Sequence, residues 1–172
     1  ITVQDNTSPT LIDVPTDATV ECDGIPAPPT VTATDNCDPT LTVNYTEVIN
    51  VTEGCGIITR TWDVTDNCGN PTSETQILTI EDNTAPTLIG VPADATVDCE
   101  AVPTAANVTA TDNCDPTLTV NFTEVDNVVE GCGTITRTWD TEDNCGNTTS
   151  ETQVITVEDN TAPTLIGVPA DA

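Results

Sequence analysis

The chain has 172 residues, with 29 Asp plus Glu against 2 Arg, no Lys and no His, so its formal net charge is −27. This charge repels nucleic acids and anionic membrane surfaces, and the lack of His removes imidazole bases, Ser–His and Cys–His pairs and imidazole metal ligands. The apolar fraction is 36%, and abundant Val, Ile and Thr favour strands over disorder. Since no long apolar run or basic leader occurs, we expect neither membrane insertion nor a signal peptide.

Short strands are predicted in chain order at residues 10–13, 18–22, 30–34, 41–45, 58–62 and 76–80. The longer ones alternate apolar and polar residues, as in Thr30-Val31-Thr32-Ala33-Thr34. The separators carry Pro, Gly, Asp and Asn, and no segment has a helical period. Six or seven short strands without a helix predict an all-β fold, a β-sandwich of the immunoglobulin type.

The same pattern occurs twice along the chain. Asp5-Asn6-Thr7 recurs at 82–84 and at 159–161, and 56 of the 77 positions are identical between the two copies. The sequence therefore predicts tandem immunoglobulin-like repeats at 5–81 and 82–158, the last-strand end of a preceding repeat at 1–4, and the first strand of a following repeat at 159–172. Two interpretations stay open: a window on a longer tandem array, or a filament subunit whose terminal strand completes its neighbour.

Four cysteines occur at equivalent positions in each repeat. Their spacing contains no Cys-x-x-Cys, which argues against a zinc site and favours two disulfides per repeat in an oxidising, extracellular setting. Sandwich topology places two of the four cysteines at one pole of the repeat and two at the other. The predicted pairs are Cys22–Cys55 and Cys37–Cys68, repeated as Cys99–Cys132 and Cys114–Cys145.

The only cations, Arg60 and Arg137, each precede a tryptophan by two residues. We expect each Arg to pack its stem on the core edge and to meet a carboxylate such as Glu47 or Glu124. The alternative is an exposed Trp–Arg platform for a sugar.

The acids gather in Asp-Asn doublets within predicted loops, and the topology brings these loops toward the linker at 81–83. Carboxylate and amide oxygens in such number suit Ca²⁺, whereas the alternative is that the doublets are ordinary turn formers. The predicted Ca²⁺ ligands are Asp5, Asn6, Asp35, Asn36, Asp38, Asp66, Asn67, Glu81, Asp82, Asn83, Asp112, Asn113, Asp115, Asp143, Asn144, Glu158, Asp159 and Asn160.

The segment Thr61-Trp62-Asp63-Val64-Thr65-Asp66-Asn67-Cys68-Gly69-Asn70 and its copy ending at Asn147 resemble the signature strand and loop of hyalin-repeat (HYR) domains. The copy departs from the pattern with Thr141 in place of Val64. The resemblance implies an immunoglobulin-like module of extracellular adhesion proteins, such as giant surface proteins of Bacteroidota. The linker 81–86 is also similar to the Asp-Asn-Ala-Pro linker of cadherins, with one inserted Thr, so its ligands do not transfer one by one.

Together these observations predict an extracellular stalk or filament of disulfide-stapled, Ca²⁺-stiffened domains that serves surface adhesion or fibre formation. The expected partners are other copies of the repeat, in one chain or in a homopolymeric filament. The alternative is an array of ligand- or glycan-binding adhesin modules. An enzyme is not expected, because every candidate Asp occurs at the same turn position in both repeats. Residues with a structural role repeat in this way, whereas a single active site would not.

Overall fold

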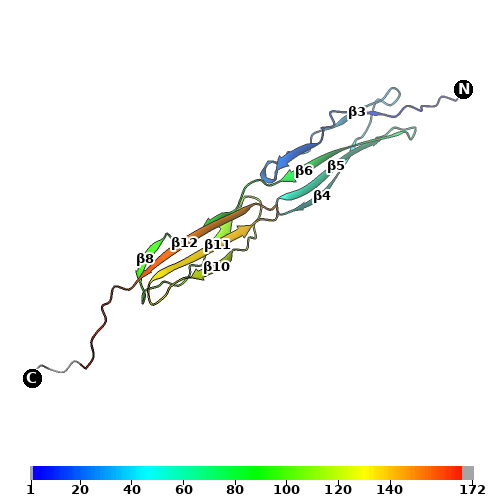
Figure 1. Ribbon diagram of the computed structural model, residues 1–172. Helices are drawn as coiled ribbons and strands as arrows, with labels where there is room; N and C mark the ends of the chain where they lie inside the picture. Colours follow the sequence, from blue (N-terminus) through cyan, green and yellow to red (C-terminus); the bar gives the residue numbers. More distant parts are fainter. Residues whose placement is uncertain (1, 168–172) are drawn as a thin grey trace, which may run out of the picture. The chain divides into compact units, whose positions relative to one another are not determined.

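The computed structural model describes residues 2–167, and they form an all-β protein (Figure 1). Each repeat contributes six strands, within the predicted number. In the first they are β1 (Thr10–Ile12), β2 (Ala18–Glu21), β3 (Thr32–Thr34), β4 (Asn44–Thr52), β5 (Cys55–Thr65) and β6 (Pro71–Glu81), with a 3₁₀ turn η1 at Cys22–Gly24. In the second they are β7 (Thr87–Ile89), β8 (Ala95–Asp98), β9 (Thr109–Thr111), β10 (Asn121–Asp126), β11 (Gly133–Glu142) and β12 (Thr148–Glu158).

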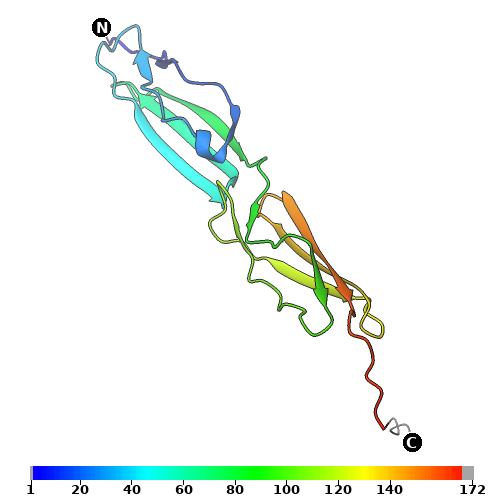
Figure 2. The same ribbon diagram turned by 90° about the vertical axis from the view of Figure 1, so that its left-hand side faces the viewer.

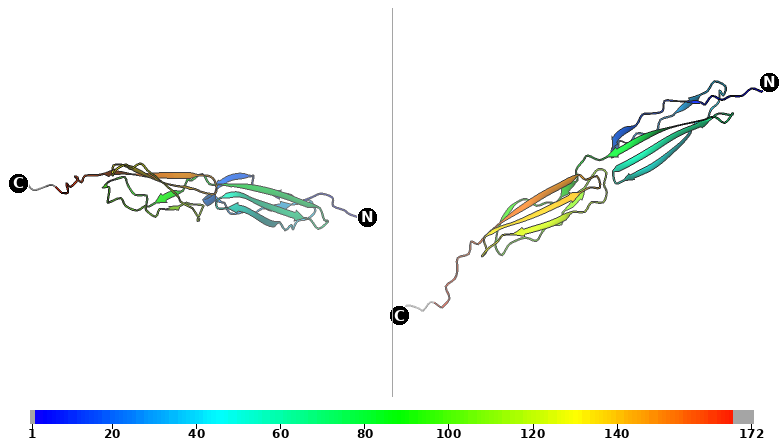
Figure 3. Two further views of the ribbon diagram at one scale, coloured as in Figure 1. Left: turned by 60° about the horizontal axis from the view of Figure 1, so that its bottom comes forward. Right: turned by 45° about the vertical axis from the view of Figure 1, so that its right-hand side comes forward.

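The first repeat folds as a four-stranded sheet, in the order β2-β6-β5-β4, with a separate β1-β3 pair. Strands β4, β5 and β6 are antiparallel neighbours, whereas β2 runs parallel to β6 (Figure 2). The second repeat has the matching order β10-β11-β12-β8 and the pair β7-β9 (Figure 3). The predicted all-β, immunoglobulin-like fold is confirmed.

The core of each repeat is small. In the first, Trp62 and Val64 pack with Leu11 and Val31, and Leu78 packs in a second cluster with Ile58 and Ile80. The side chains of β5 and β6 alternate between buried and less buried, which is why the period-two pattern located both strands, although each extends beyond the predicted 58–62 and 76–80. The two clusters recur in the second repeat around Trp139 and Ile155.

Strand β4 differs from the prediction of 41–45, because it begins at Asn44 and runs to Thr52. It is an edge strand that pairs only with β5, and nearly all of its side chains are exposed. A strand without a buried face shows no alternation of apolar residues, so the sequence did not reveal its length.

The Arg60 guanidinium is buried, with 2% of the residue exposed, and its Nε donates to Glu47 at 2.8 Å. Its Nη2 donates to the Pro26 carbonyl at 2.7 Å, and Arg137 makes the same contacts with Glu124 and the Pro103 carbonyl. The predicted ion pairs are therefore confirmed. Since Trp62 is also 2% exposed, the alternative of a surface Trp–Arg sugar platform is wrong.

The chain divides into two compact units that do not follow the repeats. One unit contains Ile1–Ala85, Asp112–Thr117 and Glu142–Asn147, and the other contains Pro86–Thr111, Leu118–Thr141 and Thr148–Ala172. The first unit thus includes two loops that belong to the second sequence repeat. Of the predicted end segments, Ile1 and residues 168–172 lie outside the described residues, and residues 159–167 contain no strand. Among the described residues, no helix has the length and apolar character that crossing a membrane needs.

Candidate functional site

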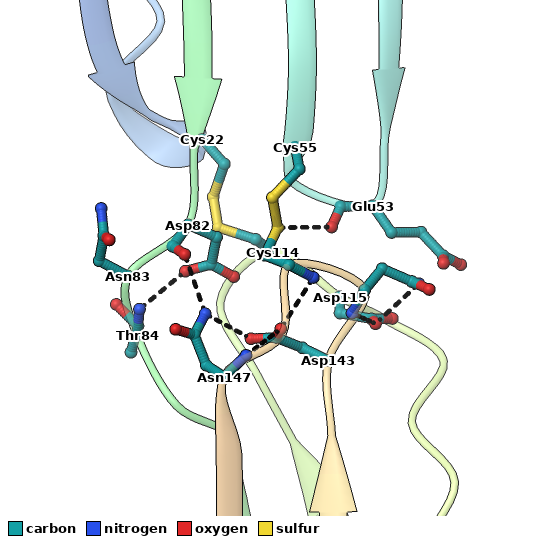
Figure 4. The surroundings of a disulfide bond; sticks show 12 residues. Cys22, Glu53, Cys55, Asp82, Asn83, Thr84, Cys114, Asp115, Asp143 and Asn147 are labelled. Atoms are coloured by element: carbon teal, nitrogen blue, oxygen red, sulfur yellow. Dashed lines mark hydrogen bonds between the residues drawn. A yellow bond between two sulfur atoms is a disulfide. The ribbon is translucent and has the colours of Figure 1, made fainter.

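Two disulfides connect the first repeat to loops of the second, and all four cysteines lie in the first compact unit. Cys22 follows β2 and bonds to Cys114, with 6.1 Å between the Cα atoms. Cys55 begins β5 and bonds to Cys145, with a Cα separation of 5.8 Å (Figure 4). Both separations are usual for a disulfide. These two bonds, called the staples below, cross from one repeat to the next in the sequence.

The predicted pairing within each repeat is therefore wrong. Cys22 and Cys55 bond to Cys114 and Cys145 instead of to each other, and Cys37, Cys68, Cys99 and Cys132 are unpaired and exposed. The prediction assumed that two cysteines at one pole of a repeat reach each other. In the structure, each of them instead meets a cysteine from a loop of the next repeat.

A turn at Glu53-Gly54 precedes Cys55 and packs against the loop of Cys114. Glu53 and Gly54 both have positive φ, at 43° and 94°. A Cβ added at Gly54 would lie 2.7 Å from the Cys114 Cβ, too close for any other residue, and 3.4 Å from the Asp82 Cβ. The Glu53 carboxylate accepts from the Thr117 hydroxyl at 2.7 Å. Glycine is required here by both the backbone conformation and the close approach.

Two carboxylates lie beside the staples. Oxygens of Asp82 and Asp112 and the sulfur of Cys114 lie within 4.8 Å of one another. Asp82 is 5% exposed, and its Oδ1 accepts from the Thr84 amide at 3.0 Å. The Oδ2 atoms of Asp82 and Asp112 are buried and have no hydrogen-bond partner. Two bare oxygens of this kind are costly unless a proton or a cation neutralises them.

The pKa of Asp82 also indicates that its negative charge needs a proton or a cation nearby. Burial raises the pKa of the Asp82 carboxyl, and the neighbouring charges of Asp112 and Asp143 raise it further, against a lowering by the Thr84 amide. The ionised form of Asp82 is therefore disfavoured in the folded protein, and binding a cation relieves the same repulsion as protonation does.

The donor set fits a hard cation. Because Cys114 is half of a disulfide, its sulfur is not a thiolate, and the chain has no His. The remaining ligands are carboxylate oxygens, which suit Ca²⁺ better than zinc or copper. Asp82 and Asp112 are the residues that would hold such an ion, and its charge would offset theirs.

An equivalent cluster occurs at the matching positions of the first repeat. Carboxylate oxygens of Asp5, Asp35 and Asp66 lie within 4.8 Å of one another. Asp35 Oδ2 is buried without a partner, as in its counterpart Asp112. Asp5 is half-buried, whereas its counterpart Asp82 is buried beneath Gly54. The predicted convergence of linker and loop acids thus occurs at both positions.

Other members of the predicted ligand set form turns. Asp38 accepts from both nitrogens of Asn67, and Asp115 accepts in the same way from Asn144. Amide donation from Thr117 and from the Asn144 side chain lowers the pKa of Asp115. Their oxygens are already satisfied, so the turn interpretation describes these residues.

The remaining predicted ligands lie elsewhere. Asn36 and Asn113 donate to the sulfurs of the cysteines that follow them. Asn83 donates to Glu21, and Asp159 accepts from the Thr161 amide. Among the described acids of the predicted set, Asp159, Glu81 and Glu158 belong to neither acid cluster.

Sequence reasoning missed two residues that organise the loops. Asn147 Nδ2 donates to Asp143 Oδ2 and to the Asp82 carbonyl, both at 2.8 Å, which ties the linker to the second-repeat loop. Asn70 makes the equivalent bonds to Asp66 and to the Asp5 carbonyl, and its donation is the largest cause of the lowered pKa of Asp66. The signal was the Gly-Asn pair at the same offset after each fourth cysteine.

Residues 87–157 match the family model of an HYR-like domain with 4 cysteines. The match supports the resemblance that the Trp, Asp and Gly-Asn pattern indicated, and it supports an immunoglobulin-like HYR repeat. No curated protein matches the chain.

Among solved structures, the chain is similar to Drosophila N-cadherin EC1-3, at 15% identity and a TM-score of 0.34, over 90% of this chain and 68% of that chain. It is also similar to Drosophila N-cadherin EC1-4, at 14% identity and a TM-score of 0.33, over 88% of this chain and 51% of that one.

Proposed function

We propose that this chain is part of an extracellular structural array, in which disulfide staples join successive HYR-like repeats so that they resist extension and unfolding. The observation that carries the proposal is the crossing of the staples: Cys22 bonds to Cys114 and Cys55 bonds to Cys145. Bonds within a repeat protect only that repeat, whereas bonds between repeats transmit tension past the linker. The role is mechanical and not enzymatic.

Disulfides, the HYR-like match and the acidic composition all support a place outside the cell or on its surface. Adhesion is the role that this family match favours. The array would provide reach and strength between an anchor and whatever lies at its far end.

The staples make a measurable prediction under force. When the chain is pulled from its ends, the force passes from Cys22 to Cys114 through their disulfide bond. The intervening chain, a sequence separation of 92 residues, therefore cannot extend while the staples are intact. At 3.3–3.6 Å per extended residue, reduction of both staples lengthens the fully extended chain by about 310 Å. Single-molecule extension with and without a reductant measures this difference. Equal lengths in the two conditions would remove the proposal.

We further propose that Ca²⁺ binds beside the staples through Asp82 and Asp112. The support is the pair of buried Oδ2 atoms without partners and the raised pKa of Asp82. The ion would offset the repulsion of the carboxylates and so stiffen the linker against the loop of Cys114. Here the ion is structural and takes part in no reaction.

Thermal melting in Ca²⁺, in Mg²⁺ and in chelator tests the calcium proposal. We expect Ca²⁺ to raise the Tm more than Mg²⁺, which sheds its water reluctantly. The matched control is Asp23→Asn, which removes one exposed acid from η1 and leaves both clusters intact. A Tm that does not change on chelation would overturn the calcium proposal and leave the staples untouched.

A further inference from the structure

Each unpaired cysteine is the counterpart of a paired one. In the repeat, Cys37 and Cys68 hold the positions of Cys114 and Cys145, and Cys99 and Cys132 hold the positions of Cys22 and Cys55. The chain therefore carries one complete pair of staples and two separate halves of the same arrangement. All four cysteines of the half-arrangements are exposed.

The half that contains Cys37 and Cys68 has the local structure of its stapled counterpart. The Cys37 amide donates to Asp35 at 2.9 Å, and the Cys114 amide donates to Asp112 at 2.8 Å. The Cys68 and Cys145 amides donate to their aspartates at 2.9 and 2.8 Å. The loops are thus formed without a bonded partner, and both cysteines line one open hollow of about 220 Å³.

The half that contains Cys99 and Cys132 has the same turn as its stapled counterpart, with shorter strands on either side of it, because β10 ends at Asp126 whereas β4 runs to Thr52. Cys99 follows β8 as Cys22 follows β2, and Cys132 closes a turn with Val129 just before β11. Glu130 and Gly131 have φ of 51° and 85°, close to the values at Glu53 and Gly54. This half therefore presents its two thiols at matching places in the chain, Cys99 directly after β8 and Cys132 directly before β11.

We propose that the two halves bind each other between copies of this chain, head to tail, with Cys99 bonded to Cys37 of a second copy and Cys132 bonded to Cys68 of that copy. This inference rests on the staples of the proposed function and adds the partner. A heterologous contact of this kind leaves one unbonded half on each copy of a pair, so that further copies can add in the same way.

The chemistry of the new bonds balances. Each bond joins two thiols, which lose two protons and two electrons, and a small-molecule disulfide such as oxidised glutathione accepts them to become two thiols. In the stapled loops Cys114 bonds to Cys22, and Cys145 to Cys55, so neither pair of cysteines from one repeat bonds internally. The same preference is expected at the exposed halves.

Charge sets a condition on assembly, because both halves are acidic. Asp5 and Asp66 line the hollow that holds Cys37 and Cys68. Asp98, Glu100 and Asp159 line the hollow that holds Cys99. Acids also meet at the existing staples, where Asp82 and Asp112 converge. Cross-linking is therefore expected to be faster in added salt, which screens like charges.

Two capped variants test the proposal. Cys37→Ser/Cys68→Ser keeps only the Cys99 and Cys132 half. Cys99→Ser/Cys132→Ser keeps only the Cys37 and Cys68 half. All four substituted residues are exposed and unbonded, so both variants keep the folded core. In a glutathione redox buffer, we expect each variant alone to stay monomeric and their mixture to form a disulfide-linked dimer.

Peptide mapping of the non-reduced dimer identifies the bonds. Cys99–Cys37 and Cys132–Cys68 between copies support the proposal. It is overturned by dimers within either variant alone, by a mixture that stays monomeric, or by Cys37–Cys68 and Cys99–Cys132 bonds within the unmodified chain. The same digest also tests the proposed function separately. A Cys22–Cys114 peptide supports the staples even if no bond forms between copies, whereas its absence contradicts the staples themselves.

Discussion

Removal of one staple should destabilise the first compact unit by an amount that the loop length sets. The perturbation is the double variant Cys22→Ser/Cys114→Ser, which leaves no unpaired partner behind. The separation of 92 residues corresponds to about 4.6 kcal/mol in the chain-entropy model for a bond acting alone. While Cys55–Cys145 remains, the bond closes a loop of about 64 residues, which corresponds to about 4.3 kcal/mol.

The assay is equilibrium unfolding in urea without reductant, followed by the fluorescence of Trp62 in a Trp139→Phe background. Trp62 is buried in the first unit, so its emission reports the unfolding of that unit. We expect the free energy of unfolding to fall by about 4 kcal/mol and the m-value to rise, because the denatured chain is less constrained.

The matched control replaces the equivalent cysteines of the unpaired half. Cys37→Ser/Cys68→Ser removes two thiols that form no bond, so its unfolding free energy should equal that of the parent within about 0.5 kcal/mol. If Cys22→Ser/Cys114→Ser behaved like this control, or if mapping linked Cys22 to Cys55, the reasoning from crossed staples would be refuted.

Three further predictions concern the site and the core. Asp82→Asn should raise the Tm in chelator, because it removes a buried charge, and it should abolish the gain from Ca²⁺, which for the parent reaches about 2.7 kcal/mol at 100 times Kd; a Ca²⁺ response kept in this variant would exclude Asp82 as a ligand. Gly54→Ala should cost more in urea unfolding than Gly131→Ala, because both strain a positive φ by about 1–2 kcal/mol but only Gly54 meets a Cβ at 2.7 Å; equal losses would contradict the close approach. Glu47→Gln should cost about 2 kcal/mol at neutral pH, since it replaces the charged acceptor of the buried Arg60 with a neutral one and the pair is partly exposed at Glu47. Hydrogen bonds from Arg60 and Tyr45 lower the pKa of Glu47, so the parent has this stability above the unfolded pKa of about 4.3 and loses it as the pH falls through the folded value. Acid titration of the Tm should therefore be steeper for the parent than for Glu47→Gln, and parallel curves would contradict the assignment.

The chemistry of the site was predictable where local spacing decides it. The Asp-Asn-Cys loops predicted both the turns and the convergence of acids, because each aspartate accepts from amides two to four residues away. Asp35 and Asp66 are examples, as are Asp112 and Asp143 at the same offsets. The distinction between a satisfied acid such as Asp38 and a bare one such as Asp82 was not predictable, because it depends on donors that other loops supply.

By itself, the sequence determined the all-β class, the repeated strands of the core and the turn chemistry of the acids, because these follow from residue periods and short-range hydrogen bonds. Only the tertiary structure decided which cysteines bond. Along the chain Cys55 is much nearer to Cys22 than Cys114 is, and chain entropy favours the nearer partner. The packing of Gly54 and Asp82 against the loop of Cys114 outweighs that preference, and no pattern within one repeat contains this contact.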